Sequence, residues 1–268
     1  MLRRCRPFLG TFVEVTADDG GAIEAAFAAI EIVHRLMSAH DSQSDISRIN
    51  RLAHIKPVEV HDWTARVLER SLFWSKQSEG AFDVIRAGRS AISQGMLPLH
   101  ADQPAPEAAH WTWLELQGAV ARLLKPGCVD LGGIAKGFAV DRALDALRES
   151  GADRGFVNAG GDMAGFGQVW PAVIVGPRRR EAVAEVSLEN EALATSALVG
   201  DSFRHLPSAD ERWISASVRA PAAMDADALT KVLLSKSAKV ERCLELAGAN
   251  GLRIAGDGSV EPVKFVAA

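Results

Sequence analysis

Residues 129–147 read VDLGGIAKGFAVDRALDAL, and this segment decides the fold. We expect a helix over about 135–150 that ends at Gly151, because helices commonly need a left-handed residue just past their last turn. Two adjacent glycines precede this helix, and glycine there lets backbone amides approach a ligand. Free amides and the positive end of the helix dipole favour a phosphate group, and Lys136 adds a cation at the same place.

The same glycines have a plainer interpretation, since a Gly-Gly pair before a helix also shapes a tight turn. A second segment, residues 156–162, reads FVNAGGD and indicates a strand that runs into another glycine pair. Asn158 and Asp162 flank that pair and offer hydrogen bonds to a heterocycle or a ribose, whereas the alternative is an ordinary hairpin turn. Ligand binding and simple turns both stay open at these two places.

The rest of the chain alternates strands and helices, with no repeat or low-complexity linker. Residue periodicity and turn residues predict strands over 12–16, 155–158, 171–175 and 214–219, a turn over 18–21 and helices over 23–37 and 226–246, the last with a break. A further helix is predicted to have Asp62 as its N-cap and to end before Gly80. The tail over 252–263 is predicted as a hairpin, and 97–107 as an exposed loop. We expect the α+β class, with mixed sheets packed against helices in a single domain over 1–268.

Composition excludes several function classes. The formal net charge of −4 argues against a nucleic-acid surface, because neutralising phosphates needs a clustered basic excess. The sequence has no run of about 18 apolar residues, so it predicts no transmembrane segment. It also has no apolar stretch of about 7–15 residues near the N-terminus, so it predicts no signal peptide. We therefore expect a cytoplasmic protein. The three cysteines lie far apart, which indicates neither a disulfide framework nor a zinc site.

The two glycine segments resemble the paired signature of the ApbE family, the FAD:protein FMN transferases. The signature is carried by DLGGIAKGFAVD over 130–141 and VNAGGD over 157–162. Other matching segments follow in order: LGTFVEV (9–15), LMSAHDSQSDISRIN (36–50), SEGAFD (78–83), ATS (194–196) and ADAL (226–229). This ordered set covers about residues 9–235 and is far more specific than any one motif. The resemblance implies a single ApbE-like, T-fold-like domain.

The resemblance also implies a reaction. A Thr or Ser hydroxyl of an acceptor protein attacks the FMN-side phosphorus of FAD, AMP leaves, and Mg²⁺ neutralises the pyrophosphate. The metal ligands implied are the carbonyl of Ala135 and the carboxylate of Asp227. The flavin-binding candidates implied are Met37, Ser44, Asn50, Asp83, Asp130, Gly132, Gly133, Lys136, Gly137, Asp141, Asn158, Gly160, Gly161, Asp162, Thr195 and Ser196. Of these, Met37 also fits a helical core stripe.

This chain departs from the family pattern at two places. Lys231 stands where the family usually has a metal-binding Thr or Ser, four residues after Asp227, and i,i+4 spacing lets the two side chains pair. Such an ammonium discourages a cation or partly replaces its charge, while the hydroxyl of Thr230 offers a substitute ligand. The second departure is a shortened segment after the ATS strand, in which His205 is the remaining candidate base, with an ordinary loop histidine as the alternative. Asp227 and His205 are therefore the candidate catalytic residues.

Three functions remain open from the sequence. The first is an FMN transferase that uses FAD, Mg²⁺ and an acceptor protein. The second is a flavin-binding or flavin-delivering protein in which transfer is weak or lost, and the third is a metal-dependent FAD pyrophosphatase in which water replaces the protein hydroxyl. A dinucleotide-binding dehydrogenase is set aside, because its glycine motif follows the first strand of a βαβ unit.

Overall fold

The computed structural model describes residues 1–93, 95, 97, 109–176, 181–198 and 209–263. Its large sheet has the strand order β1-β2-β6-β7-β10-β11-β12-β13, and every neighbouring pair is antiparallel. The strands of this sheet are β1 (Leu2–Phe8), β2 (Thr11–Ala17), β6 (Gly155–Ala159), β7 (Asp162–Phe166), β10 (Ala192–Ala197), β11 (Trp213–Ala220), β12 (Asn250–Ala255) and β13 (Val260–Val263). Two smaller sheets contain β3 (Val58–Glu59), β5 (Val120–Leu123) and β4 (Leu114–Gln117), and β8 (Trp170–Val175) and β9 (Ala182–Leu188).

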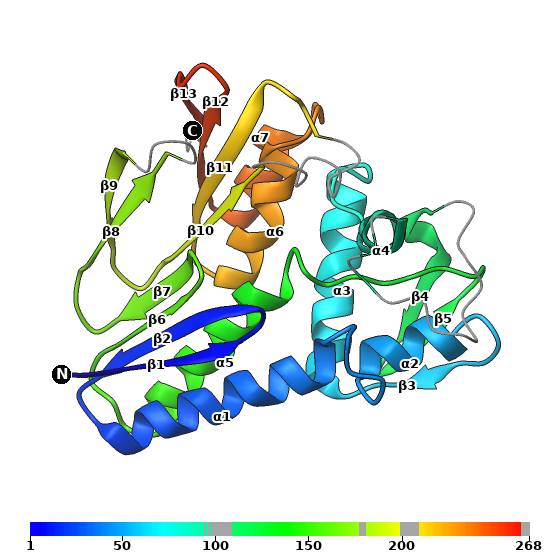
Figure 1. Ribbon diagram of the computed structural model, residues 1–268, viewed down its shortest axis with the longest axis horizontal. Coiled ribbons are helices and arrows are strands. Elements are labelled where there is room, and N and C mark those ends of the chain that lie inside the picture. The colour runs from blue at the N-terminus through cyan, green and yellow to red at the C-terminus, as the bar shows by residue number, and fades with distance from the viewer. Residues whose placement is uncertain (94, 96, 98–108, 177–180, 199–208, 264–268) are drawn as a thin grey trace.

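The helices fall into two groups (Figure 1). Helix α1 (Gly20–Met37) lies beside α5 (Ala135–Glu149), and α6 (Ala223–Leu233) packs against α5 and against β10 and β11. The second group lies to one side with the three-stranded sheet and holds α2 (Asp45–Leu52), α3 (Asp62–Gln77), α4 (Val84–Ser93) and the short 3₁₀ helix η1 (Trp111–Trp113). Helix α7 (Val240–Ala247) follows α6. The α+β class is confirmed.

The core lies between the large sheet and the first helix group and continues into the second group. Strand β2 alternates buried and less buried residues, so that Val13 and Val15 lie on its inner face. The apolar stripe predicted for α1 is buried, with Ile23 and Ile30 fully inaccessible. Helix α5 packs between α1 and α6 and contacts β6 and β7. Its first turn therefore lies where sheet and helices meet.

Helices α5 and α6 approach unusually closely at Gly137. A Cβ atom added there would lie 2.1 Å from the carbonyl oxygen of Ala223. Only glycine permits this approach without moving backbone, so Gly137 has a packing role at this crossing. No helix in the described ranges is long and apolar enough to cross a membrane.

Several predicted elements are confirmed. Helix α5 ends at Glu149, and Gly151 has a φ of +83° just beyond it, as expected for a left-handed residue at this position. The long helix predicted over 226–246 is broken into α6 and α7, and the tail forms the β12–β13 hairpin. Of the predicted loop over 97–107, all but Leu97 lies outside the described residues.

Other predictions were wrong in detail. Helix α1 begins at Gly20 because the Asp19 carboxylate accepts the amide of Ala22, so the predicted turn over 18–21 overlaps the first helical turn. The N-cap of α3 is His61, whose Nδ1 accepts the Trp63 amide, and Asp62 is the first helical residue. Helices α2 and α4 were not predicted.

The close crossing of α5 and α6 gives a stability prediction. Replacing Gly137 by alanine is expected to lower the free energy of unfolding by about 3 kcal/mol, because the added methyl group overlaps the Ala223 carbonyl. Urea unfolding measures this change. Gly20→Ala is the matched control, since a Cβ at Gly20 meets side-chain atoms no closer than 3.4 Å. Equal stability of the two variants would contradict the proposed close packing.

Candidate functional site

The loop before α5 leaves two backbone amides unpaired. No side chain caps α5 at Ile134, and the Gly137 amide donates to Oδ2 of Asp227 at 3.2 Å. The Gly132 amide donates to Oδ1 of Asp130 at 2.8 Å. In the described part of the chain, the amides of Gly133 and Lys136 have no hydrogen-bond partner. Together with the helix dipole, these two amides suit a phosphate oxygen, as predicted for this loop.

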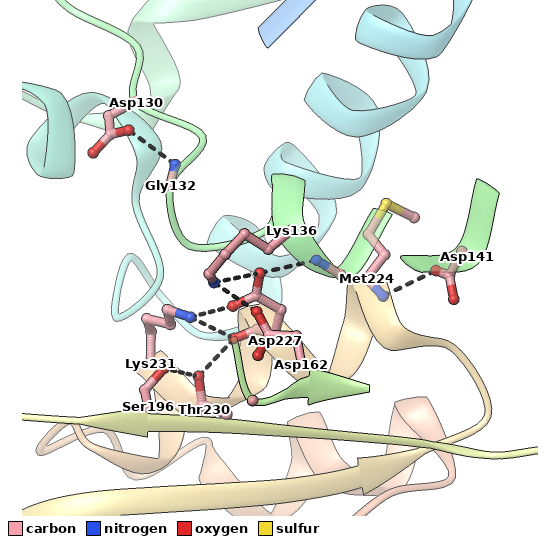
Figure 2. A network of polar contacts seen from close by, with 12 residues as sticks. Asp130, Gly132, Lys136, Asp141, Asp162, Ser196, Met224, Asp227, Thr230 and Lys231 are labelled. Atoms are coloured by element: carbon pink, nitrogen blue, oxygen red, sulfur yellow. Dashed lines mark hydrogen bonds and ion pairs between the residues drawn. The ribbon is translucent and has the colours of Figure 1, made fainter. Parts of the chain in front are cut away.

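Four charged side chains converge beside this loop (Figure 2). We call Lys136, Asp162, Asp227 and Lys231 the charge quartet. Lys136 Nζ lies 2.6 Å from Asp162 Oδ2 and 3.5 Å from Asp227 Oδ2. Lys231 Nζ forms a short ion pair with Asp227 Oδ1 and donates to the Asp227 carbonyl oxygen at 3.0 Å. The i,i+4 pairing of Lys231 with Asp227 that the sequence predicts is therefore confirmed.

The electrostatics of the quartet hold Asp227 in its charged form. Asp227 is fully buried, which by itself favours protonation, but the ammonium groups of Lys136 and Lys231 outweigh this and lower its pKa. Burial likewise opposes the charge of Lys136, yet attraction from Asp227 and Asp162 raises its pKa. Burial and the neighbouring charge of Asp227 raise the pKa of Asp162 to about 6. Two ammonium groups thus balance two carboxylates when all four are ionised.

The second glycine segment is both a hairpin and a part of the site. Gly160 and Gly161 form the turn between β6 and β7 with φ angles of +67° and +104°. The Gly161 amide donates to Oδ1 of Asn158 at 3.0 Å, which fixes the turn locally. The hairpin reading of the sequence is correct for the backbone, and the turn places Asp162 against Lys136.

Two hydroxyl groups, one from α6 and one from strand β10, border the quartet. Thr230 Oγ1 donates to the carbonyl oxygen of Asp227 at 2.7 Å and lies 2.7 Å from Ser196 Oγ. Thr195 Oγ1 lies 2.8 Å from Ser217 Oγ on β11. The structure therefore brings Ser196 and Thr230 to the quartet, whereas Thr195 contacts the neighbouring strand.

A cavity of about 280 Å³ opens beside the start of α5. Its lining includes the predicted residues Met37, Asp130, Gly132, Ala135 and Lys136. His34 also lines it, which the sequence analysis missed although His34 precedes Met37 by one helical turn on α1. A larger cavity of about 630 Å³ is bordered by Asp141 and by none of the quartet. The smaller cavity is therefore the candidate binding site.

Four predicted flavin-binding residues instead hold backbone in place in this structure. Ser44 caps α2 through the Ser47 amide. Asp83 accepts the amides of Ile85 and Arg86 at the start of α4 and the amide of Trp111. Asn50 bonds both the amide and the carbonyl of Val129, just before the glycine loop. Asp141 accepts the amides of Ala223 and Met224 at the start of α6, and burial raises its pKa to about 6. A contact of these four with flavin stays a prediction.

His205 lies outside the described residues, so its role as a base also stays a prediction.

Two of the three residues expected to bind Mg²⁺, Asp227 and Thr230, do not fit a divalent cation as they are arranged, while the Ala135 carbonyl stays a predicted ligand. Oδ1 of Asp227 pairs with Lys231, and Oδ2 faces Lys136 and accepts the Gly137 amide. The Thr230 hydroxyl is already bonded on both sides. Among the described residues no group of three or more His, Cys, Asp or Glu side chains is placed to hold a metal. We assign no reaction step to a metal.

Comparison with known proteins supports the motifs found in the sequence. A family model described as the ApbE family matches residues 9–253. The chain is similar to the FAD:protein FMN transferase of Haemophilus influenzae, with 27% identity over 92% of this chain and 83% of that protein. Its fold matches the ApbE protein from Thermotoga maritima (TM-score 0.84, 23% identity, covering 98% and 97% of the two chains). It also matches the flavin transferase ApbE from Vibrio cholerae (TM-score 0.81, 22% identity, covering 97% and 96%).

The quartet gives a pH-dependent stability prediction. Lys136→Met is expected to lower the free energy of unfolding by about 3 kcal/mol at pH 8, because it leaves a buried carboxylate without its partner. Without Lys136 the pKa of Asp162, already about 6, rises further. Between pH 5 and 8 the folded variant then binds more protons than its unfolded chain, so its stability falls as pH rises and the loss is smaller at pH 5.

Urea unfolding of wild type and variant at both pH values measures this difference. The double variant Lys136→Met with Asp162→Asn serves as control, since it removes the unpaired carboxylate and should recover part of the loss at pH 8. A loss of equal size at both pH values would show that Asp162 does not respond to Lys136.

Proposed function

This chain belongs to the ApbE family, and on that premise we propose that it is a flavin transferase that moves FMN from FAD onto a hydroxyl of an acceptor protein. Curated relatives named FAD:protein FMN transferase support an enzyme of this type. The observation that carries the proposal is the unpaired amides of Gly133 and Lys136 at the start of α5, beside a cavity and two ammonium groups. A pyrophosphate linked to a larger organic group is the ligand that such a site suits.

The proposed reaction exchanges one phosphorus–oxygen bond for another. The oxygen of a Thr or Ser hydroxyl bonds to the FMN-side phosphorus, and the bond from that phosphorus to the bridging oxygen breaks. AMP leaves with the bonding electron pair, and the hydroxyl proton is released to solvent. Such a transfer depends mainly on positioning and on charge stabilisation, since little covalent chemistry falls to the protein.

The chain's own residues supply binding and charge in this proposal. The glycine loop and the start of α5 hold phosphate oxygens through backbone amides, while Lys136 brings a cation fixed by Asp162. The cavity bordered by Met37 and His34 receives part of the FAD molecule. Preorganised cations stabilise the charge that develops on the departing phosphate without reorganising during the reaction. Cytoplasmic location and the identity of the acceptor stay predictions.

A labelling assay tests the function. The protein is incubated with FAD, magnesium chloride and a candidate acceptor protein that has an accessible target threonine, and covalent flavin fluorescence is read in a denaturing gel. We expect a fluorescent acceptor band and an equal amount of AMP, and no band when the target threonine is replaced by alanine.

The products separate the three candidate functions. Free FMN and AMP without a labelled acceptor would show that the protein hydrolyses FAD and does not transfer FMN. FAD that binds but stays intact would show that the protein binds or delivers flavin without cleaving it. Either result contradicts the transferase proposal.

A further inference from the structure

Lys231 contacts the same Asp227 oxygens to which a metal cation would bind. Its ammonium group contacts both Oδ1 and the backbone carbonyl oxygen of Asp227, and its side chain is only 17% exposed. Since the two groups are one helical turn apart on α6, the pairing needs no distant element to form. A divalent cation at Asp227 would first have to displace this ammonium group.

The charge balance of the quartet leads to the same conclusion. Lys136 and Lys231 carry two positive charges, and Asp162 and Asp227 carry two negative charges when ionised. A divalent cation added to this neutral, largely buried group would create an uncompensated charge of two, and burying unpaired charge is costly. Without a metal, the two ammonium groups can still donate hydrogen bonds to an incoming pyrophosphate, although the quartet as a whole carries no net charge.

The tip of Lys231 also lies against the glycine loop. A Cβ atom added at Gly133 would come within 3.1 Å of Lys231 Cε. The end of the Lys231 side chain therefore lies next to Gly133, whose amide is one of the two where the proposed function places a phosphate. Figure 2 shows Lys136 and Lys231 reaching the Asp227 carboxylate from separate elements.

From these three observations we propose that the Lys231 ammonium group takes the place of a divalent cation, and that flavin transfer by this protein needs no metal. The proposal rests on the proposed function. The bonds made and broken are those of that reaction, and Lys231 forms and breaks no covalent bond. Its role is to place an ammonium group beside the pyrophosphate and the departing AMP phosphate, and Asp227 is the positioning residue that holds it there.

Two measurements on the wild-type protein test this directly. Isothermal titration with magnesium chloride, on protein treated with EDTA and free of FAD, is expected to show no binding in the millimolar range. The rate of acceptor labelling in excess EDTA is expected to stay within twofold of the rate in magnesium chloride. Loss of labelling in EDTA with recovery in magnesium would overturn the proposal and leave the transferase function intact.

Variants at position 231 provide the matched comparison. Lys231→Thr restores the hydroxyl that the family pattern has here, so we expect measurable Mg²⁺ binding and a rate in EDTA about 100-fold below wild type, recovered by magnesium. Lys231→Met, which supplies neither charge nor ligand, should be slow under both conditions. Lys239→Thr is the control, because the Lys239 ammonium group pairs, within the described ranges, with the exposed Glu79, and the variant should behave like wild type.

The outcomes distinguish failure of this proposal from failure of the function. If no condition yields a labelled acceptor, the transferase function is refuted, and the titration alone then decides whether Lys231 excludes the metal. Mg²⁺ binding by wild type as tight as by Lys231→Thr would refute that exclusion. Urea unfolding of each variant confirms that altered rates do not reflect loss of the fold.

Discussion

Helices α5 and α6 are held together by two carboxylates, each of which accepts backbone amides from the first turn of the other helix. We call this reciprocal capping the carboxylate exchange. Asp227 of α6 accepts the amide of Gly137 in α5, and Asp141 of α5 accepts the amides of Ala223 and Met224 in α6. Neither helix has a side-chain cap from its own N-cap residue. Each helix therefore depends on the other to satisfy its free amides, and Gly137 allows the close approach that this exchange requires.

The same exchange creates the functional site, because it buries Asp227 completely. A buried carboxylate must be paired or protonated, and the fold pairs it with ammonium groups from α5 and from its own helix. The β6–β7 turn then adds Asp162 to balance the second ammonium group. Cations are thereby fixed next to the unpaired amides of the glycine loop, so that the contact which assembles the core also prepares the site for a phosphate.

Local sequence signals predicted the parts of this arrangement that depend on neighbours in the chain. The end of α5 at Gly151, the break between α6 and α7 and the pairing of Lys231 with Asp227 all follow from short-range rules. Helix α4 was missed although Asp83 accepts the amides of its first turn, which is a local signal. Its packing is not local, because Gly88 fits against Cys128, where a Cβ would lie 2.1 Å from the carbonyl oxygen. Long-range packing of this kind leaves no periodic signal.

The sequence by itself determined the family, the glycine loop and the lysine that replaces a usual metal ligand, because each is carried by residues close together in the chain. Only the tertiary structure decided what those residues do. It joined Lys136, Asp162 and Asp227 from three separate segments, and it gave Asp141 a helix to cap. The physical reason is that charge balance in a buried site is set by distances between segments, which spacing along the chain does not contain.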